Sequence, residues 1–138
     1  VYTILGDGEI QEGQVWEAAM FASAKGLDNL VAVVDNNGLQ IDGKISEVNS
    51  PYPIAEKFKS FGWNVIEICA HSFDEIDAAF NAAAEFKGKP SVIVANSVKG
   101  KGVSFMEDQV SWHGTAPNAE QYEQAMSELT QALAELEA

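Results

Sequence analysis

Two short polar segments, each at the end of an apolar run, carry residue types from which a metal and phosphate site could be built. The run at residues 1–5 ends in Gly6-Asp7-Gly8, and the run at residues 30–34 ends in Asp35-Asn36-Asn37-Gly38. A hard cation such as Mg²⁺ takes oxygen ligands in an octahedron and commonly shares them with a phosphate. Asp7 and Asn37 can each supply one oxygen, and a backbone carbonyl after Asn37 could supply a third.

Either polar segment alone is also typical of an ordinary turn, because Gly, Asp and Asn are the usual turn residues. Their paired occurrence at the ends of two apolar runs favours a binding site, provided that the two runs form neighbouring strands. The charge of the chain bears on the ligand: the formal net charge is −13, so a diphosphate would need a metal cation to bind here.

The segments that must hold these residues alternate between strand and helix patterns. The apolar run at residues 1–5 predicts a buried strand, and the continuous apolar run at residues 30–34 predicts a strand covered on both faces. Residues 64–68 and 91–95 predict a third and a fourth strand. Helical spacing predicts helices over residues 14–25, near residues 54–61, after a capping signature at Ser72, and after Asn118. Strands separated by helices imply right-handed crossovers and a parallel sheet. We therefore expect an α/β fold, a parallel sheet with helices on both faces.

Two long segments without a regular pattern follow predicted strands, at residues 35–52 and 98–117. Both lie where ligands of open α/β folds collect, at the carboxyl ends of the strands. Loops of this length in a compact domain are commonly functional. We expect Trp16, Met20 and Phe21 to pack in the core, Cys69 to be a buried thiol, and His71 to lie in a loop. The apolar seam of the last helix is expected to pack in the core, with a partner surface as the alternative.

The composition narrows the classes of function. A chain of 138 residues with 46% hydrophobic residues fits one globular domain or part of one, not a disordered chain. It has no apolar stretch of the roughly 20 residues that span a bilayer, and its acidity disfavours nucleic acid, so neither a membrane nor nucleic acid is an expected partner. The single cysteine fits a reducing, cytoplasmic setting. The chain starts inside a strand pattern without Met, which we interpret as a partial domain over residues 1–138.

Longer motifs resemble those of one enzyme family. The segment GDGEIQEGQVWEA, followed by VVDNNGLQIDG, is similar to the thiamine diphosphate motif of transketolases, which starts with GDG and closes with an Asn at the separation of Asp7 and Asn37. The segment KGKGVSFMEDQVSWHG, residues 99–114, resembles a later active-site loop of that family. The resemblance covers essentially the whole chain and points to the amino-terminal half of split bacterial or archaeal transketolases.

The resemblance implies a diphosphate-binding domain that holds thiamine diphosphate and Mg²⁺, with Ca²⁺ or Mn²⁺ as possible substitutes. The implied metal ligands are Asp7, Asn37 and the carbonyl of Leu39. Gly8 would donate its amide to the diphosphate, and Ile41 would pack near the thiazolium ring. The implied cofactor-binding residues are Gly6, Asp7, Gly8, Glu9, Asn37, Leu39, Ile41, Lys99 and His113.

The resemblance also implies catalytic roles. His113, flanked by Trp112 and Gly114, would bond the diphosphate and lie near the substrate. Glu12, and with it Glu17, would lie at an interface between subunits that links two active sites. The alternative for these glutamates is an exposed helix face. For the loop lysines, Lys99 and Lys101, the alternative is a solvated charge.

The implied activity is transfer of a two-carbon ketol unit between sugar phosphates. The Glu that activates the cofactor in this family belongs to the pyrimidine-binding domain, which the motifs here do not include. We therefore expect a companion carboxy-terminal half that supplies that domain, and a homo-oligomer. Deoxyxylulose-phosphate synthase and the dehydrogenases of 2-oxo acids share the cofactor and remain alternatives, as does a binding or assembly module without turnover.

Overall fold

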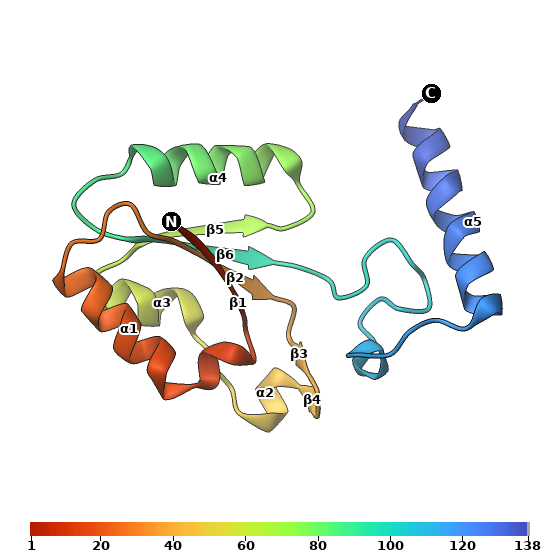
Figure 1. Cartoon of the computed structure of the whole chain (residues 1–138), viewed down its shortest axis with the longest axis horizontal. Coiled ribbons are helices and arrows are strands. Elements are labelled where there is room, and N and C mark those ends of the chain that lie inside the picture. The colour runs from red at the N-terminus through yellow and green to blue at the C-terminus, as the bar shows by residue number, and fades with distance from the viewer. Residues whose placement is uncertain (138) are drawn as a thin grey trace.

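A four-stranded parallel sheet forms the centre of the molecule, shown by a computed structural model that describes residues 1–137 (Figure 1). In spatial order its strands are β1 (Tyr2–Gly6), β2 (Val31–Asn36), β6 (Ser91–Asn96) and β5 (Asn64–Cys69). Every neighbouring pair is parallel. The strand and helix alternation of the sequence predicted a parallel sheet, and the expected fold class is confirmed.

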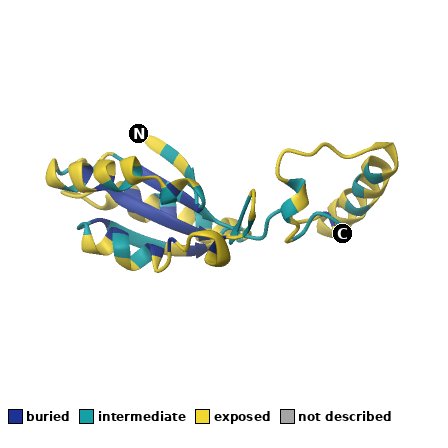
Figure 2. Cartoon of the chain, turned by 90° about the horizontal axis from the view of Figure 1, so that it is seen from below, coloured by how far each residue is buried: buried dark blue, intermediate teal, exposed yellow. Residues whose placement is uncertain are grey.

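Helices cover the sheet on both faces (Figures 1 and 2). On one face α1 (Gly13–Ala24) and α3 (Ile54–Ser60) pack against a core cluster that includes Phe58 and Val34. On the other face α4 (Phe73–Glu85) packs against a second cluster that includes Ile93. Because both faces are covered, β6 in the middle of the sheet is buried from Ser91 to Ala95, which explains its uninterrupted apolar sequence.

The helix starts follow from side-chain caps. Ser72 accepts the backbone N–H of Glu75 at 3.3 Å and begins α4. Asn118 and Gln121 form a reciprocal capping box that begins α5 (Ala119–Leu136). Each cap satisfies backbone N–H groups that have no partner within their own helix. The predicted capping positions are thus confirmed.

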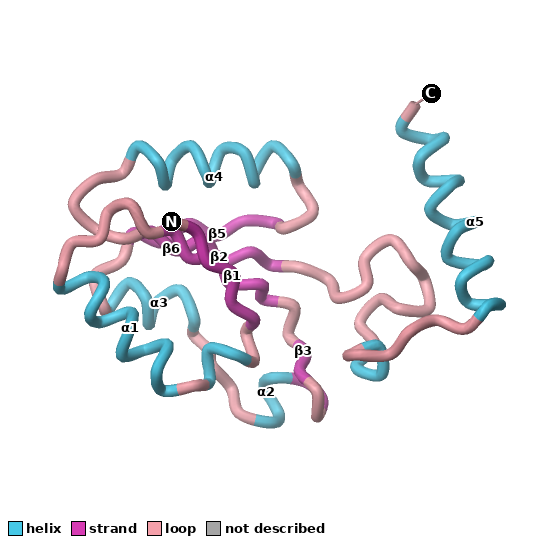
Figure 3. The backbone as a smooth tube through the Cα atoms, viewed as in Figure 1, coloured by secondary structure: helices cyan, strands magenta, loops and turns pink. Residues whose placement is uncertain are grey.

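The first long loop is more ordered than its sequence indicates (Figure 3). After β2 the chain forms a small hairpin and a single turn of helix before α3. The second loop holds one 3₁₀ turn, and another follows β1. These short elements are β3 (Leu39–Gln40), β4 (Gly43–Lys44), α2 (Ile45–Val48), and the 3₁₀ turns η1 (Glu9–Gln11) and η2 (Val110–Trp112).

Four packing expectations are wrong. The strand predicted to be buried at residues 1–5 is partly open, because β1 is an edge strand: its Tyr2 and Ile4 are 65% and 76% exposed. Met20 and Phe21 are 49% and 59% exposed, because α1 turns only its Ala19 and Ala22 side fully into the core. Cys69 is exposed at the end of β5. The helix α5 has no buried residue, because it stands apart from the sheet beyond the loop that follows β6 (Figures 1 and 2). No helix within residues 1–137 is long and apolar enough to cross a bilayer.

Candidate functional site

Strand pairing brings the two polar segments together at the carboxyl edge of the sheet. In the parallel register of β1 and β2, Gly6 lies opposite Asp35. The backbone N–H of Asp7 continues the ladder by donating to the carbonyl of Asp35 at 3.1 Å. The two turns that follow these strands therefore face each other, as the sequence required for a shared site.

Asp7 is the buried acid of this site, with only 1% of its surface exposed. Its Oδ1 accepts the N–H of Gly8 at 2.8 Å, and its Oδ2 accepts the N–H of Gly38 at 2.6 Å. Burial nevertheless raises the pKa of the Asp7 carboxyl above its ordinary value, and the nearby Asp35 carboxylate adds to the rise, while the N–H donors oppose it. A cation beside Asp7 would relieve this cost, because it compensates a desolvated negative charge.

Asn37 is held by hydrogen bonds on both ends of its amide. Its Oδ1 accepts the N–H of Leu39 at 3.0 Å, and its Nδ2 donates to Oδ2 of Asp35 at 3.1 Å. The second oxygen of Asp35 accepts the hydroxyl of Ser97, which follows β6. Asp35 and Ser97 thus orient Asn37, a predicted metal ligand, although neither residue was assigned a role from the sequence. The signal for Asp35 was its place within the DNNG segment, whereas Ser97 had none.

A cavity of about 430 Å³ opens at this edge of the sheet. Every residue that we predicted from the sequence to bind the cofactor lines this cavity. These residues come from the turns after β1 and β2 and from the loop after β6. Two further residues, Asp35 and Gln40, line it as well. The full lining is Gly6, Asp7, Gly8, Glu9, Asp35, Asn37, Leu39, Gln40, Ile41, Lys99 and His113.

The predicted interface glutamates lie elsewhere. Glu12 is the residue before α1, and Glu17 is on that helix; both are exposed, and neither lines the cavity. Glu12 is therefore not among the residues that line the cavity with Asp7. A role at an interface between subunits stays a prediction for both glutamates.

The residues around the cavity fit a metal bound together with an anion. Asp7, Asn37 and nearby backbone offer the oxygen ligands that Mg²⁺ prefers, and Lys99 and His113 bring donors for an anion to the same cavity. No group of three or more His, Cys, Asp or Glu side chains within residues 1–137 could hold a metal by itself. A metal here would accordingly need amide, backbone and ligand oxygens.

Gly8, in the turn after β1, sits where a larger residue would not fit easily beside the cavity. A Cβ at Gly8 would lie 3.2 Å from Cβ of Gln40, which is tighter than most such contacts. Gln40 in turn carries the one buried side-chain nitrogen or oxygen within residues 1–137 that lacks a hydrogen-bond partner, its Nε2. The turn after β1 is therefore closely packed on one side and presents backbone to the cavity.

Comparison with known proteins identifies the family. The sequence profile of "Transketolase, thiamine diphosphate binding domain" matches residues 1–134. The chain belongs to the transketolase family. The matching profile describes the thiamine diphosphate-binding domain, so this chain represents that part of a transketolase. The motifs around Asp7, Asn37 and His113 agree with this assignment.

Two curated transketolase relatives are bacterial subunits. The chain is 46% identical to the 6-deoxy-6-sulfo-D-fructose transketolase subunit SqwG of Clostridium sp. (strain MSTE9) over 94% of its own length and 47% of that protein. It is 40% identical to an apulose-4-phosphate transketolase subunit of Phocaeicola vulgatus over 99% of its own length and 48% of that protein. The chain thus spans about half the length of these relatives.

Solved transketolase structures share the fold. A high-resolution crystal structure of transketolase from Campylobacter jejuni superposes with a TM-score of 0.88 at 29% sequence identity, and the match covers 94% of this chain and 20% of that one. A Pichia stipitis transketolase mutant in complex with fructose 6-phosphate gives a TM-score of 0.87 at 27% identity, over 94% of this chain and 19% of that one. The parallel sheet with helices on both faces is therefore the fold of a transketolase domain.

Proposed function

We propose that this chain is the diphosphate-binding part of a transketolase that transfers a two-carbon ketol unit between sugar phosphates. The observation that carries the proposal is the convergence of Asp7, Asn37 and Leu39 with Lys99 and His113 around one cavity. The ligands of a hard cation and the donors for a diphosphate are needed together at such a site. Thiamine diphosphate, when bound, supplies the nucleophilic carbon of the reaction.

Each residue has a distinct task in this proposal. Asp7, Asn37 and the carbonyl of Leu39 bind Mg²⁺, or Ca²⁺ or Mn²⁺ in its place. Gly6, Gly8, Glu9 and Ile41 shape the cavity around the cofactor, with the N–H of Gly8 directed to the diphosphate. Lys99 adds a positive charge for the diphosphate.

His113 is proposed to bond the diphosphate and to lie beside the substrate, where its imidazole can donate or accept a proton. Glu12 and Glu17 are proposed to meet a second protomer, since both are exposed on or next to α1. A homo-oligomer in the cytoplasm is the setting in which such an interface would work, and the single cysteine fits a reducing compartment.

A companion chain completes the proposal. The curated relatives named above are called subunits, which supports an enzyme encoded in more than one chain. The companion would supply the pyrimidine-binding domain and the glutamate that activates the cofactor. The two relatives are named for different sugars, and we propose sugar phosphates as the substrate class.

The test is calorimetry and turnover with the complete enzyme that contains this chain. We expect thiamine diphosphate to bind only when Mg²⁺ or a substitute divalent cation is present, and a ketose phosphate to serve as the donor. Turnover of pyruvate with an aldehyde instead would favour a deoxyxylulose-phosphate synthase. Cofactor binding without any turnover would favour a binding module over an enzyme. Absence of Mg²⁺-dependent binding would refute the proposed metal and diphosphate site.

A further inference from the structure

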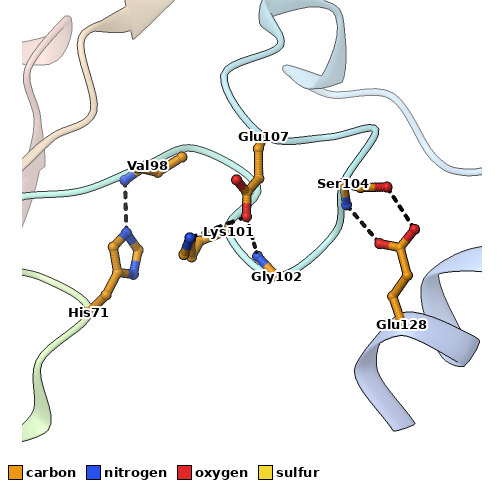
Figure 4. A network of polar contacts seen from close by, with 7 residues as sticks. All are labelled: His71, Val98, Lys101, Gly102, Ser104, Glu107 and Glu128. Carbon is orange, nitrogen blue, oxygen red and sulfur yellow. Dashed lines mark hydrogen bonds and ion pairs between the residues drawn. The ribbon is translucent and has the colours of Figure 1, made fainter. Parts of the chain in front are cut away.

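The loop that carries Lys99 is tied to the sheet by a residue outside the cavity. His71 lies in the turn between β5 and α4, and its Nε2 accepts the backbone N–H of Val98 at 2.8 Å (Figure 4). The residue before Val98 is also held at the sheet: Ser97 donates its N–H to the carbonyl of Asn36 at 3.2 Å and its hydroxyl to Asp35. From Val98 to Gly114, the bond from His71 is the one hydrogen bond that joins the described loop to residues 1–96. An imidazole nitrogen accepts an N–H only when that nitrogen carries no proton.

The contact acts next to a residue of the cavity. Val98 directly precedes Lys99, whose carbonyl accepts the N–H of Asp108 at 3.0 Å. The backbone of Lys99 is thus held on both sides, by His71 through Val98 and by Asp108. Moreover, Gly100 has φ of +73°, and a Cβ there would lie 2.6 Å from the carbonyl oxygen of Met106, so the turn is closed on itself.

The other polar contacts of the loop hold it together but do not attach it to the sheet (Figure 4). Glu107 accepts the N–H of Gly102 at 3.0 Å and pairs with Lys101 at 3.5 Å. Glu128 of α5 accepts the N–H of Ser104 at 2.7 Å and its hydroxyl at 2.6 Å. The loop and α5 therefore form a connected unit, and His71 holds this unit at the sheet one residue beyond the contacts of Ser97.

We propose that His71 is a positioning residue for the cofactor site. It holds Val98 at the carboxyl edge of the sheet and so keeps Lys99 and His113 at the cavity that contains Asp7. His71 does not line this cavity, so it acts through the loop and not on the cofactor. The inference rests on the proposed function, because the site that it positions is the proposed diphosphate site.

Two variants of His71 test whether its hydrogen bond to Val98, and not only its presence in the turn, positions the loop. His71→Leu removes the acceptor, whereas His71→Gln places an amide oxygen the same number of bonds from the backbone as Nε2. In the complete enzyme we expect His71→Leu to weaken Mg²⁺-dependent binding of thiamine diphosphate roughly five- to tenfold, the scale of one lost hydrogen bond, and His71→Gln to restore most of it. Phe73→Leu, two residues further and at a position 88% exposed, serves as the control and should change nothing.

A second readout needs no cofactor. Hydrogen exchange at the Val98 amide should accelerate in His71→Leu and return toward the parent rate in His71→Gln. Equal affinity of the parent and His71→Leu, or equal losses in both variants, would overturn the inference. If the parent enzyme itself does not bind thiamine diphosphate, the proposed function fails, and the exchange rate at Val98 then decides alone whether His71 holds the loop.

Discussion

The backbone N–H of Gly38 donates to the carboxylate of Asp7 at 2.6 Å, although 31 positions separate the two residues in the sequence. This bond joins the turn after β1 to the turn after β2, and the pairing of Gly6 with Asp35 brings those turns into reach. The metal ligand proposed on one turn is therefore oriented by the other. A change in either turn should disturb both halves of the site.

Replacing Asp7 by Asn removes the charge that is proposed to face the cation. We expect Asp7→Asn to weaken Mg²⁺-dependent binding of thiamine diphosphate by about 1.5–3 kcal/mol, the range for a hydrogen bond to a charged group. Calorimetry with the complete enzyme measures this. Asp42→Asn makes the same charge change at an exposed position outside the cavity and should leave the affinity intact. Unaltered affinity in Asp7→Asn would remove Asp7 from the metal site.

The raised pKa of the Asp7 carboxyl predicts a pH effect on the chain without metal. Because burial lifts the native pKa above the ordinary value of 3.8, the native state holds more protons than the unfolded state between those two values. The stability contributed by protonated Asp7 is present below pH 3.8 and is lost as the pH rises through the native pKa.

Mg²⁺ should compete with that proton. We therefore expect binding of Mg²⁺ with thiamine diphosphate to release protons in weakly acidic buffer, and the release to shrink in Asp7→Asn. Calorimetry in two buffers with different enthalpies of ionisation counts the protons. The same proton count in parent and variant would show that Asp7 is not the group that titrates.

Two lysines of one loop offer a matched pair. Lys99 lines the cavity, whereas the side chain of Lys101 is 52% exposed and pairs with Glu107 at 3.5 Å. Loss of a charge that contacts the diphosphate should cost affinity, so Lys99→Ala is expected to weaken binding of thiamine diphosphate roughly tenfold. Lys101→Ala should have little effect, since exposed ion pairs contribute little. Equal effects of the two changes would contradict a specific contact by Lys99.

Replacement of His113 is expected to affect turnover and not the stability of the fold. It lies on an exposed loop, so His113→Ala should leave thermal unfolding unchanged. Turnover by the complete enzyme should fall by about 10²-fold or more, the usual range for loss of a group that transfers a proton. Gln109→Ala, on the same loop and outside the cavity, is the control. Parent-like turnover in His113→Ala would make His113 a surface residue.

Exposed apolar side chains predict association of the chain. Met126, Leu129 and Leu133 on α5 are 43%, 44% and 55% exposed, and no residue of this helix is buried. An apolar stripe of this kind is usually covered in a functional assembly. Sedimentation of the chain at micromolar concentration should show a species larger than 14.9 kDa. A clean monomer that binds thiamine diphosphate tightly by itself would contradict this expectation.

The sheet, and the placement of Asp7 and Asn37 around one cavity, could be predicted, because both follow from strand periodicity and from the geometry of parallel strands. The exposure of Met20, Phe21 and Cys69 could not. Periodicity shows which face of an element is apolar, but it does not show whether another element covers that face. The contact of His71 with Val98 was equally hidden, since it joins two loops without periodicity across 27 positions.

The closed turn at Gly100 limits how this chain could be engineered. Gly100, Gly102 and Asp108 all have positive φ, and at Gly100 a side chain would also collide with the backbone of Met106. A mutant library that randomised the whole loop would lose most of its members at that single codon, whatever the other positions offered. A library over this loop should therefore keep Gly100 fixed and vary its neighbours.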